Sequence, residues 1–146
     1  MDRVMKICFL SLNSYPMLTN KNLGYAGGAE VEQVSLAKEL VTYGYDVSFV
    51  TYSHGNRETE KADGITIIKT YERDEASKLS IFQKYKLIWS ALKKVGADTY
   101  FHESGATGIL PLFCGINRKK YVHRIASDAT VLSKSLWKIQ FQSKNC

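Results

Sequence analysis

VMKICFLSL at residues 4–12 and GGAEVEQVSLAKELVTYG at residues 27–44 are the two stretches of sequence that decide the fold. The first is nearly continuous in apolar residues, which is typical of a central parallel strand covered on both faces. The second carries apolar residues at helical spacing over residues 29–43 and then a glycine, Gly44, which favours a left-handed stop. A strand, a long Gly-rich loop and a helix therefore open the chain.

The rest of the sequence continues this alternation of strands and helices. We expect strands at 46–52, 65–71, 98–102 and 120–125, helices at 78–95 and 105–114 (the latter stopped near Gly115), a polar loop at 53–64 and a short helix around 132–141. In the helix at 78–95, Ile81, Tyr85, Ile88, Leu92 and Val95 should form one apolar face. Alternating strands and helices predict an α/β protein with a Rossmann-like, mostly parallel sheet and helices on both faces.

Composition indicates one soluble domain that spans residues 1–146. Hydrophobic residues make up 45% of the 146 residues and charged residues 23%, which is ordinary for a globular protein and excludes a disordered chain. No segment approaches the roughly 20 apolar residues that cross a bilayer. The three cysteines have no metal-ligand spacing, and Cys8 and Cys114 stand in apolar runs that favour buried thiols. We therefore expect a cytoplasmic protein, at most peripheral to the inner face of the membrane, without a metal.

The net charge of +6 predicts a surface that attracts anions, although it does not select among nucleotides, phosphosugars, anionic lipid and nucleic acid. The lysines are scattered and no nucleic-acid-binding motif is present, so nucleic acid is not an expected partner. The helix at 78–95 is basic and amphipathic. It is expected to be a core helix with a solvated face, and weak contact with an anionic membrane is the alternative.

The glycines before the first helix form the first candidate site. Gly27 and Gly28 would let a ligand approach the backbone, and the unpaired N–H groups of a helix start favour an anion. The alternative is a tight turn that requires positive φ. The spacing matches neither the dinucleotide fingerprint nor a P-loop, because no G-x-G-x-x-G follows the strand directly and no Gly-Lys-Ser/Thr follows the glycines.

The combination of these segments resembles the opening of family 4 glycosyltransferases. The matching features are KICFL at 6–10, GGAE at 27–30, AKEL at 37–40, GYDV at 44–47 and VHRIASD at 122–128. The resemblance implies the N-terminal, acceptor-side domain of a GT-B enzyme, which retains the anomeric configuration and uses a nucleotide-sugar as substrate, without a metal or other cofactor. It also places Gly27, Gly28 and Glu30 in the loop that faces the donor across the cleft.

The same resemblance supplies three candidates at the reaction centre. Many members carry His-x-His at the end of the fourth strand; in this chain Glu103 stands at the position of the second histidine, and His102 lies one residue before it. Many also end the fifth strand in His-Asp, where Asp128 stands here after a serine. The alternatives are a hydrogen-bonded surface histidine for His102 and a helix cap for Asp128.

The Glu-rich motif and second Gly-rich loop of the family's donor-binding domain do not occur in this sequence. We therefore expect a domain incomplete at its C-terminus, with a separate C-terminal half as one partner and a hydroxyl acceptor (a glycan, a lipid-linked or a small molecule) as another. Two other hypotheses stay open: a truncated, non-catalytic remnant or binding module of the same fold, and another Rossmann-like nucleotide-binding protein.

Overall fold

A computed structural model describes residues 3–21, 27–55, 57–103, 108–125 and 138–142. The elements run in the order β1 (Lys6–Leu10), α1 (Tyr15–Thr19), α2 (Gly28–Thr42), β2 (Asp46–Ser53), β3 (Thr59–Ala62), β4 (Ile65–Glu72), a 3₁₀ helix (Arg73–Lys78), α3 (Ile81–Val95), β5 (Thr99–Glu103), α4 (Ile109–Asn117), β6 (Lys120–Ile125) and β7 (Lys138–Gln142).

These strands form one sheet in the order β3-β4-β2-β1-β5-β6-β7. The five strands from β4 to β6 are parallel, and β3 and β7 pair antiparallel at the two edges. The chain builds outward from β1 through β2 to β4, then crosses to the other side of β1 to add β5 and β6. The predicted α/β class with a mostly parallel sheet is confirmed, and the strand order reverses between β1 and β5.

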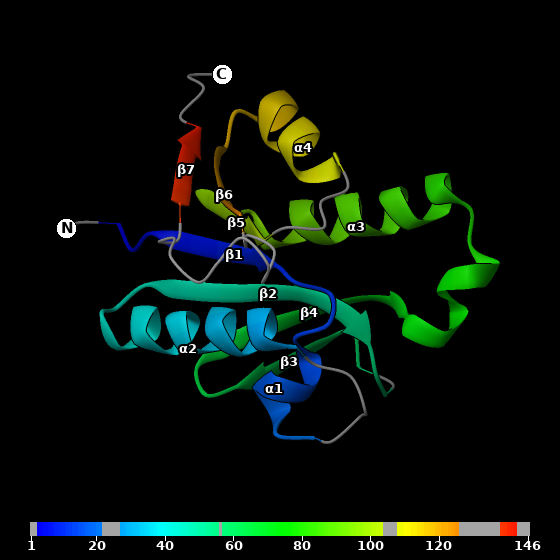
Figure 1. The fold of residues 1–146 in the computed structure, drawn as a ribbon, viewed down its shortest axis with the longest axis horizontal. Helices are drawn as coiled ribbons and strands as arrows, with labels where there is room; N and C mark the ends of the chain where they lie inside the picture. The colour runs from blue at the N-terminus through cyan, green and yellow to red at the C-terminus, as the bar shows by residue number, and fades with distance from the viewer. Residues whose placement is uncertain (1–2, 22–26, 56, 104–107, 126–137, 143–146) are drawn as a thin grey trace.

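The side chains of β1 point alternately to the two faces of the sheet, and helices cover both of these faces (Figure 1). Phe9 belongs to the core under α1 and α2, where its ring stacks on that of Phe49 at 4.8 Å between centroids. Its neighbours Cys8 and Leu10 belong to the opposite core, under α3 and α4. Successive strand residues point to opposite faces, so a continuous apolar run is needed to fill both cores. Cys8 and Cys114 are both buried thiols, as predicted.

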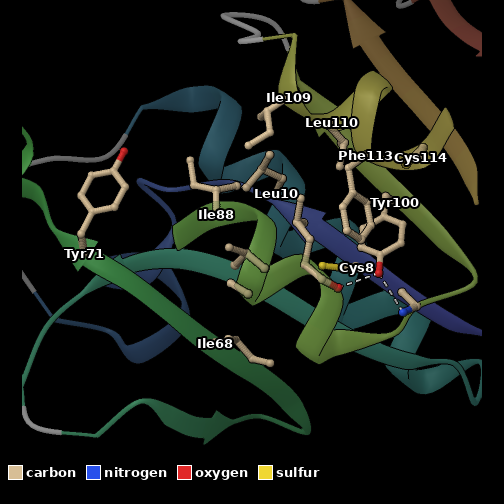
Figure 2. Packing of buried hydrophobic residues seen from close by; sticks show 14 residues of the cluster. Cys8, Leu10, Ile68, Tyr71, Ile88, Tyr100, Ile109, Leu110, Phe113 and Cys114 are labelled. Atoms are coloured by element: carbon tan, nitrogen blue, oxygen red, sulfur yellow. Dashed lines mark hydrogen bonds between the residues drawn. The ribbon is translucent and has the colours of Figure 1, made fainter. Parts of the chain in front are cut away.

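Tyr100 fixes the junction between α3 and β5 in the second of these cores (Figure 2). Its hydroxyl donates to the carbonyl oxygen of Leu92 at 2.8 Å and accepts from the N–H of Ala97 at 3.1 Å. Burial raises the pKa of Tyr100 above its usual range, so the hydroxyl stays protonated and keeps its donor. The helix end and the strand that leads to the candidate site are thereby held together.

Helix α3 begins three residues later than predicted because Ser80 caps it. The Ser80 hydroxyl accepts from the N–H of Gln83 at 3.2 Å, and the Gln83 side chain accepts from the N–H of Ser80 at 2.9 Å. The first residue of the predicted apolar face, Ile81, is 68% exposed, so the prediction that it is buried with the others was wrong. Ile88 and Leu92 are buried as predicted.

Three other expectations need correction. The polar segment 53–64 is not all loop, since it contains the antiparallel strand β3. The predicted helix around 132–141 is wrong at residues 138–141, which belong to β7; residues 126–137 lie outside the described part. Helix α4 does not stop at Gly115 but continues to Asn117, and Arg118 ends it in the left-handed conformation.

Gly64 gives a test of the turn between β3 and β4. Its φ is +78°, and a Cβ there would lie 3.1 Å from a methyl carbon of Val41. We expect Gly64→Ala to lower the free energy of unfolding by about 1 kcal/mol for the left-handed backbone, plus a smaller contact cost. Urea denaturation would measure the change. Gly55→Ala is the control, because φ there is +76° but no atom lies within 4 Å of the added Cβ. Equal losses in the two variants would contradict the contact with Val41.

Candidate functional site

A cavity of about 390 Å³ opens where the strand order reverses. Its walls come from the carboxyl ends of β1, β2, β4 and β5, the first turns of α2 and the middle of α3, and its lining is Leu10, Ser11, Leu12, Asn13, Ala29, Glu30, Gln33, Tyr52, Tyr71, Lys84, Tyr85, Ile88 and His102. We call this the switch-point cavity. In open parallel sheets, ligands bind at this place.

The loop after β1 forms one wall of the cavity because it is bonded to β2. The N–H of Ser11 donates to the carbonyl oxygen of Val50 at 3.2 Å, and the N–H of Tyr52 donates to that of Leu12 at 2.9 Å. Helix α1 follows within the long predicted loop and begins at Tyr15, with Pro16 in its first turn. The two hydrogen bonds place the polar residues after β1 beside the end of β2.

His102 occupies the end of β5 and reaches the switch-point cavity. Its Cα lies in register between those of Leu10 on β1 and His123 on β6, and the two imidazole rings are 5.9 Å apart. Burial, and secondarily the charge of His123, lowers the pKa of His102 to about 4. Within the described part of the chain, neither of its ring nitrogens has a hydrogen-bond partner. His102 is therefore a neutral imidazole at pH 7 whose two ring nitrogens are buried and make no hydrogen bond within the described residues.

The structure describes less about the other two predicted residues of the reaction centre, Glu103 and Asp128. Glu103 is the last residue of β5, in register with Arg124 of β6. Asp128 lies outside the described residues. Both stay predictions.

The predicted donor loop forms the start of α2. Gly27 is the residue before the helix, and its N–H donates to the Glu30 carboxylate at 2.8 Å. A Cβ at Gly27 would lie 2.8 Å from that same carboxylate oxygen, whereas a Cβ at Gly28 would meet nothing within 4 Å. Gly27 has a φ of −114° and Gly28 is not among the positive-φ glycines, so the alternative of a turn requiring positive φ does not apply. The close approach of the Glu30 carboxylate explains why a glycine stands at position 27. No contact within the described domain requires a glycine at position 28.

Gln33, one turn further along α2, is a cavity residue that sequence reasoning missed. Its side chain lines the switch-point cavity and the residue is 3% exposed. The amide nitrogen makes a long bond of 3.4 Å to the carbonyl oxygen of Ala29, and the amide oxygen has no partner among the described residues. A glutamine inside an amphipathic helix gives no signal of this in the sequence, because most such residues are solvated.

An ion pair links α2 to β6, which lies beyond β1 and β5 in the sheet. The guanidinium of Arg124, near the end of β6, contacts the carboxylate of Glu32. The ion pair therefore joins the helix that carries Gln33 to the strand next to β5.

A second cavity, of about 290 Å³, contains a basic cluster whose members already satisfy one another. The ammonium of Lys69, whose side chain is 3% exposed, lies 3.0 Å from the Glu60 carboxylate and donates to the carbonyl oxygen of His54. The Tyr15 hydroxyl donates to the same carboxylate at 2.8 Å. These bonds lower the pKa of Glu60, with the Lys69 bond as the larger cause. The cluster is a structural network, so the switch-point cavity is the better candidate site.

Among residues with described positions, no group of three or more histidine, cysteine, aspartate or glutamate side chains is arranged to hold a metal ion. In the same part of the chain, no helix has the length and apolar character needed to cross a membrane.

Comparison with known proteins gives a structural neighbour. No protein-family model matches the chain, and no curated protein matches it in sequence. Among solved structures, sucrose-phosphate synthase from Thermosynechococcus elongatus superimposes with a TM-score of 0.56 at 15% sequence identity. The fold is similar to one half of a GT-B glycosyltransferase. The match covers 87% of this chain and 34% of the synthase, so this chain spans about a third of the length of that protein.

Proposed function

We propose that this chain is the acceptor-side domain of a retaining glycosyltransferase related to family 4. The complete enzyme would transfer a sugar from a nucleotide-sugar to a hydroxyl group. The observation that carries the proposal is the switch-point cavity, which lies between the start of α2 and a neutral histidine at the end of β5. The similarity in fold to a GT-B half supports it.

The start of α2 would stabilise the departing nucleoside diphosphate. The first N–H groups of a helix have no intrahelical partner, and the helix dipole adds positive potential there. Gly28 leaves open space beside these groups, so a phosphate could approach the backbone closely. Such fixed dipoles act on charge as it develops, which is the largest contribution in many enzymes.

His102 would orient the reacting hydroxyl or sugar. A neutral imidazole can donate from one nitrogen and accept at the other, and both are unused within the described chain. Glu103 and Asp128 remain candidates for the same region. Glu30 would sit beside the diphosphate, where its carboxylate both caps α2 and limits the affinity for anions.

Titration of the ¹⁵N-labelled chain with UDP tests this assignment by NMR. We expect weak, salt-sensitive binding whose largest shifts fall on the amides of residues 28–30. Glu30→Gln keeps an oxygen that can accept from Gly27 but removes the negative charge, so it should raise the affinity roughly two- to five-fold.

Ser35→Ala, on an exposed part of the same helix, is the matched control and should leave the affinity unchanged. Absence of shifts at about 10 mM UDP, or shifts centred away from α2, would contradict the proposal, since even a half-site should bind in that range.

A further inference from the structure

The second cavity has a positively charged lining and shares no lining residue with the switch-point cavity. It is formed by α1, which lies beside β3, together with β4 and the segments that follow α1 and β2 (Figure 1). Its lining is Tyr15, Lys21, His54, Gly55, Arg57, Glu60 and Lys69. Three of these side chains are cations and one is an anion at pH 7, so the lining has a formal net charge of +2 with His54 neutral.

The buried part of this cavity is a closed hydrogen-bond network. The Glu60 carboxylate lies 3.0 Å from the ammonium of Lys69 and accepts from the Tyr15 hydroxyl at 2.8 Å. Lys69 also donates to the carbonyl oxygen of His54. The carboxylate of the lining is therefore neutralised by the buried cation, and it leaves the charges of the other two cations uncompensated.

These two outer cations, Lys21 and Arg57, are both exposed. The Lys21 ammonium makes a long bond of 3.3 Å to the Tyr15 hydroxyl. Within the described residues, neither outer cation has a carboxylate oxygen within 4 Å. Residues 22–26 and 56, their neighbours in the sequence, include no acidic residue. Two positive charges that face one cavity without a counter-charge favour the entry of an anion.

The imidazole of His54 is a natural reporter for such an anion. Burial, and then the charge of Lys69, lowers the pKa of His54, and Lys21 adds a smaller effect in the same direction. Glu72 and Asp74 act in the opposite direction but do not line the cavity. An anion bound beside the ring would stabilise the imidazolium and raise this pKa.

The donors that remain in the cavity fit a phosphate group. An ammonium has three N–H donors and a guanidinium five. Lys69 uses two of its donors within the network and Lys21 uses one, while Arg57 has no described partner. A phosphomonoester carries about −1.5 to −2 charges at pH 7 and three acceptor oxygens, which matches the net charge of the lining. A carboxylate would leave one positive charge uncompensated.

We propose that the second cavity binds a doubly charged phosphate group, free or carried by a small molecule, with Lys21 and Arg57 in contact with its oxygens and Lys69 at its floor. The bound group would join the segment after α1 to the segment after β2, because its two outer cations come from these segments. The site does not depend on the proposed function, since none of its residues lines the switch-point cavity.

Titration of the ¹⁵N-labelled chain with sodium sulfate at constant ionic strength tests the site, because sulfate keeps its double charge across the neutral range. We expect saturable shifts of the amides of His54, Gly55 and Arg57, with a dissociation constant of about 1–10 mM. The pKa of the His54 imidazole should rise on saturation. Shifts that do not saturate by about 100 mM sulfate, or that fall on residues 28–30 alone, would overturn the proposal.

Charge-removing variants show whether the outer cations hold the anion. Arg57→Gln and Lys21→Gln change exposed positions, so each should weaken sulfate binding at least about fivefold without a change in unfolding temperature. Lys86→Gln is the matched control, because it removes the same charge from an exposed position of α3 that lines neither cavity. An equal loss of affinity in Lys86→Gln and Arg57→Gln would show attraction by net charge alone and overturn the proposal.

Inorganic phosphate and glycerol 3-phosphate distinguish the two sources of the phosphate group. Tighter binding of the ester would identify a phosphorylated small molecule, and equal or weaker binding of the ester would identify the free ion. Acetate should bind at least about tenfold more weakly than sulfate, and equal binding would contradict a site for a dianion. The amides of residues 28–30 should respond to UDP equally in Arg57→Gln and in the unaltered chain, so this site and the proposed function can fail separately.

Discussion

Replacing Phe9 by alanine is expected to lower the free energy of unfolding by about 3–5 kcal/mol. Phe9 is fully buried in the central strand, stacked on Phe49 and within 4.8 Å of the Phe101 ring between centroids. Removal of the ring loses its transfer free energy and leaves a cavity that these two aromatic neighbours cannot both fill. Because β1 lies at the middle of the sheet, the backbone has little freedom to collapse around the gap.

Urea denaturation followed by circular dichroism measures this loss. Phe82→Ala is the matched control: Phe82 is 88% exposed at the start of α3, and its replacement should change stability by less than about 0.5 kcal/mol. A loss below about 1 kcal/mol for Phe9→Ala would mean that the core under α1 and α2 is loosely packed.

Acidification from about pH 7 to about pH 5 is expected to cost about 2 kcal/mol of stability through His102 alone. The unfolded chain takes up this proton near the usual pKa of 6.5, whereas burial lowers the pKa to about 4 in the folded chain. Between these two values the unfolded state binds more protons, so the free energy of unfolding falls as the pH falls. The loss is complete only when the pH lies below the folded pKa of about 4.

The comparison of the unaltered chain with His102→Gln isolates this effect, because the other titrating groups are common to both proteins. His123 on β6 faces the His102 ring, and Glu30 of α2 and Lys84 of α3 line the same cavity. The pKa of His54 is also lowered and gives acid sensitivity to both proteins. The difference between the two unfolding free energies should shrink by about 2 kcal/mol from pH 7 to pH 5. A pH-independent difference would show that the pKa of His102 is the same in the folded and the unfolded chain, and would contradict its lowering by burial.

The sequence predicts the parallel part of the sheet well because its signals are local. Strand β1 is a continuous apolar run, and the helices before β2 and β5 are followed by Gly44 and Gly96, both at positive φ. Each signal needs only neighbouring residues to be read. The order of the five parallel strands along the chain, with α2, α3 and α4 between them, follows from these signals.

The segments that were predicted wrongly are determined by more than their own local sequence. Strand β3 is a polar run of four residues, TEKA, that pairs only with β4. Strand β7 pairs antiparallel with β6, which no local pattern near residue 138 indicates. Helix α1 has five residues, too few to show a helical period.

The candidate site was predicted only in part for the same reason. Motif resemblance indicated His102 and the start of α2, and the structure places both at the switch-point cavity. Gln33 became visible only when burial was known, and the three tyrosines come from β2, β4 and α3. No spacing in the sequence brings such residues together.

The position of β1 between β2 and β5 has a consequence for the time course of synthesis. Strand β1 leaves the ribosome before both of its partners; it gains one partner at residues 46–50 but waits for residues 99–102 before its other edge is paired. At about 5–20 residues per second, translation of those intervening fifty or so residues takes roughly 3–10 seconds. During this interval the nascent chain carries an apolar strand with an open edge, which is a surface that can pair with other chains.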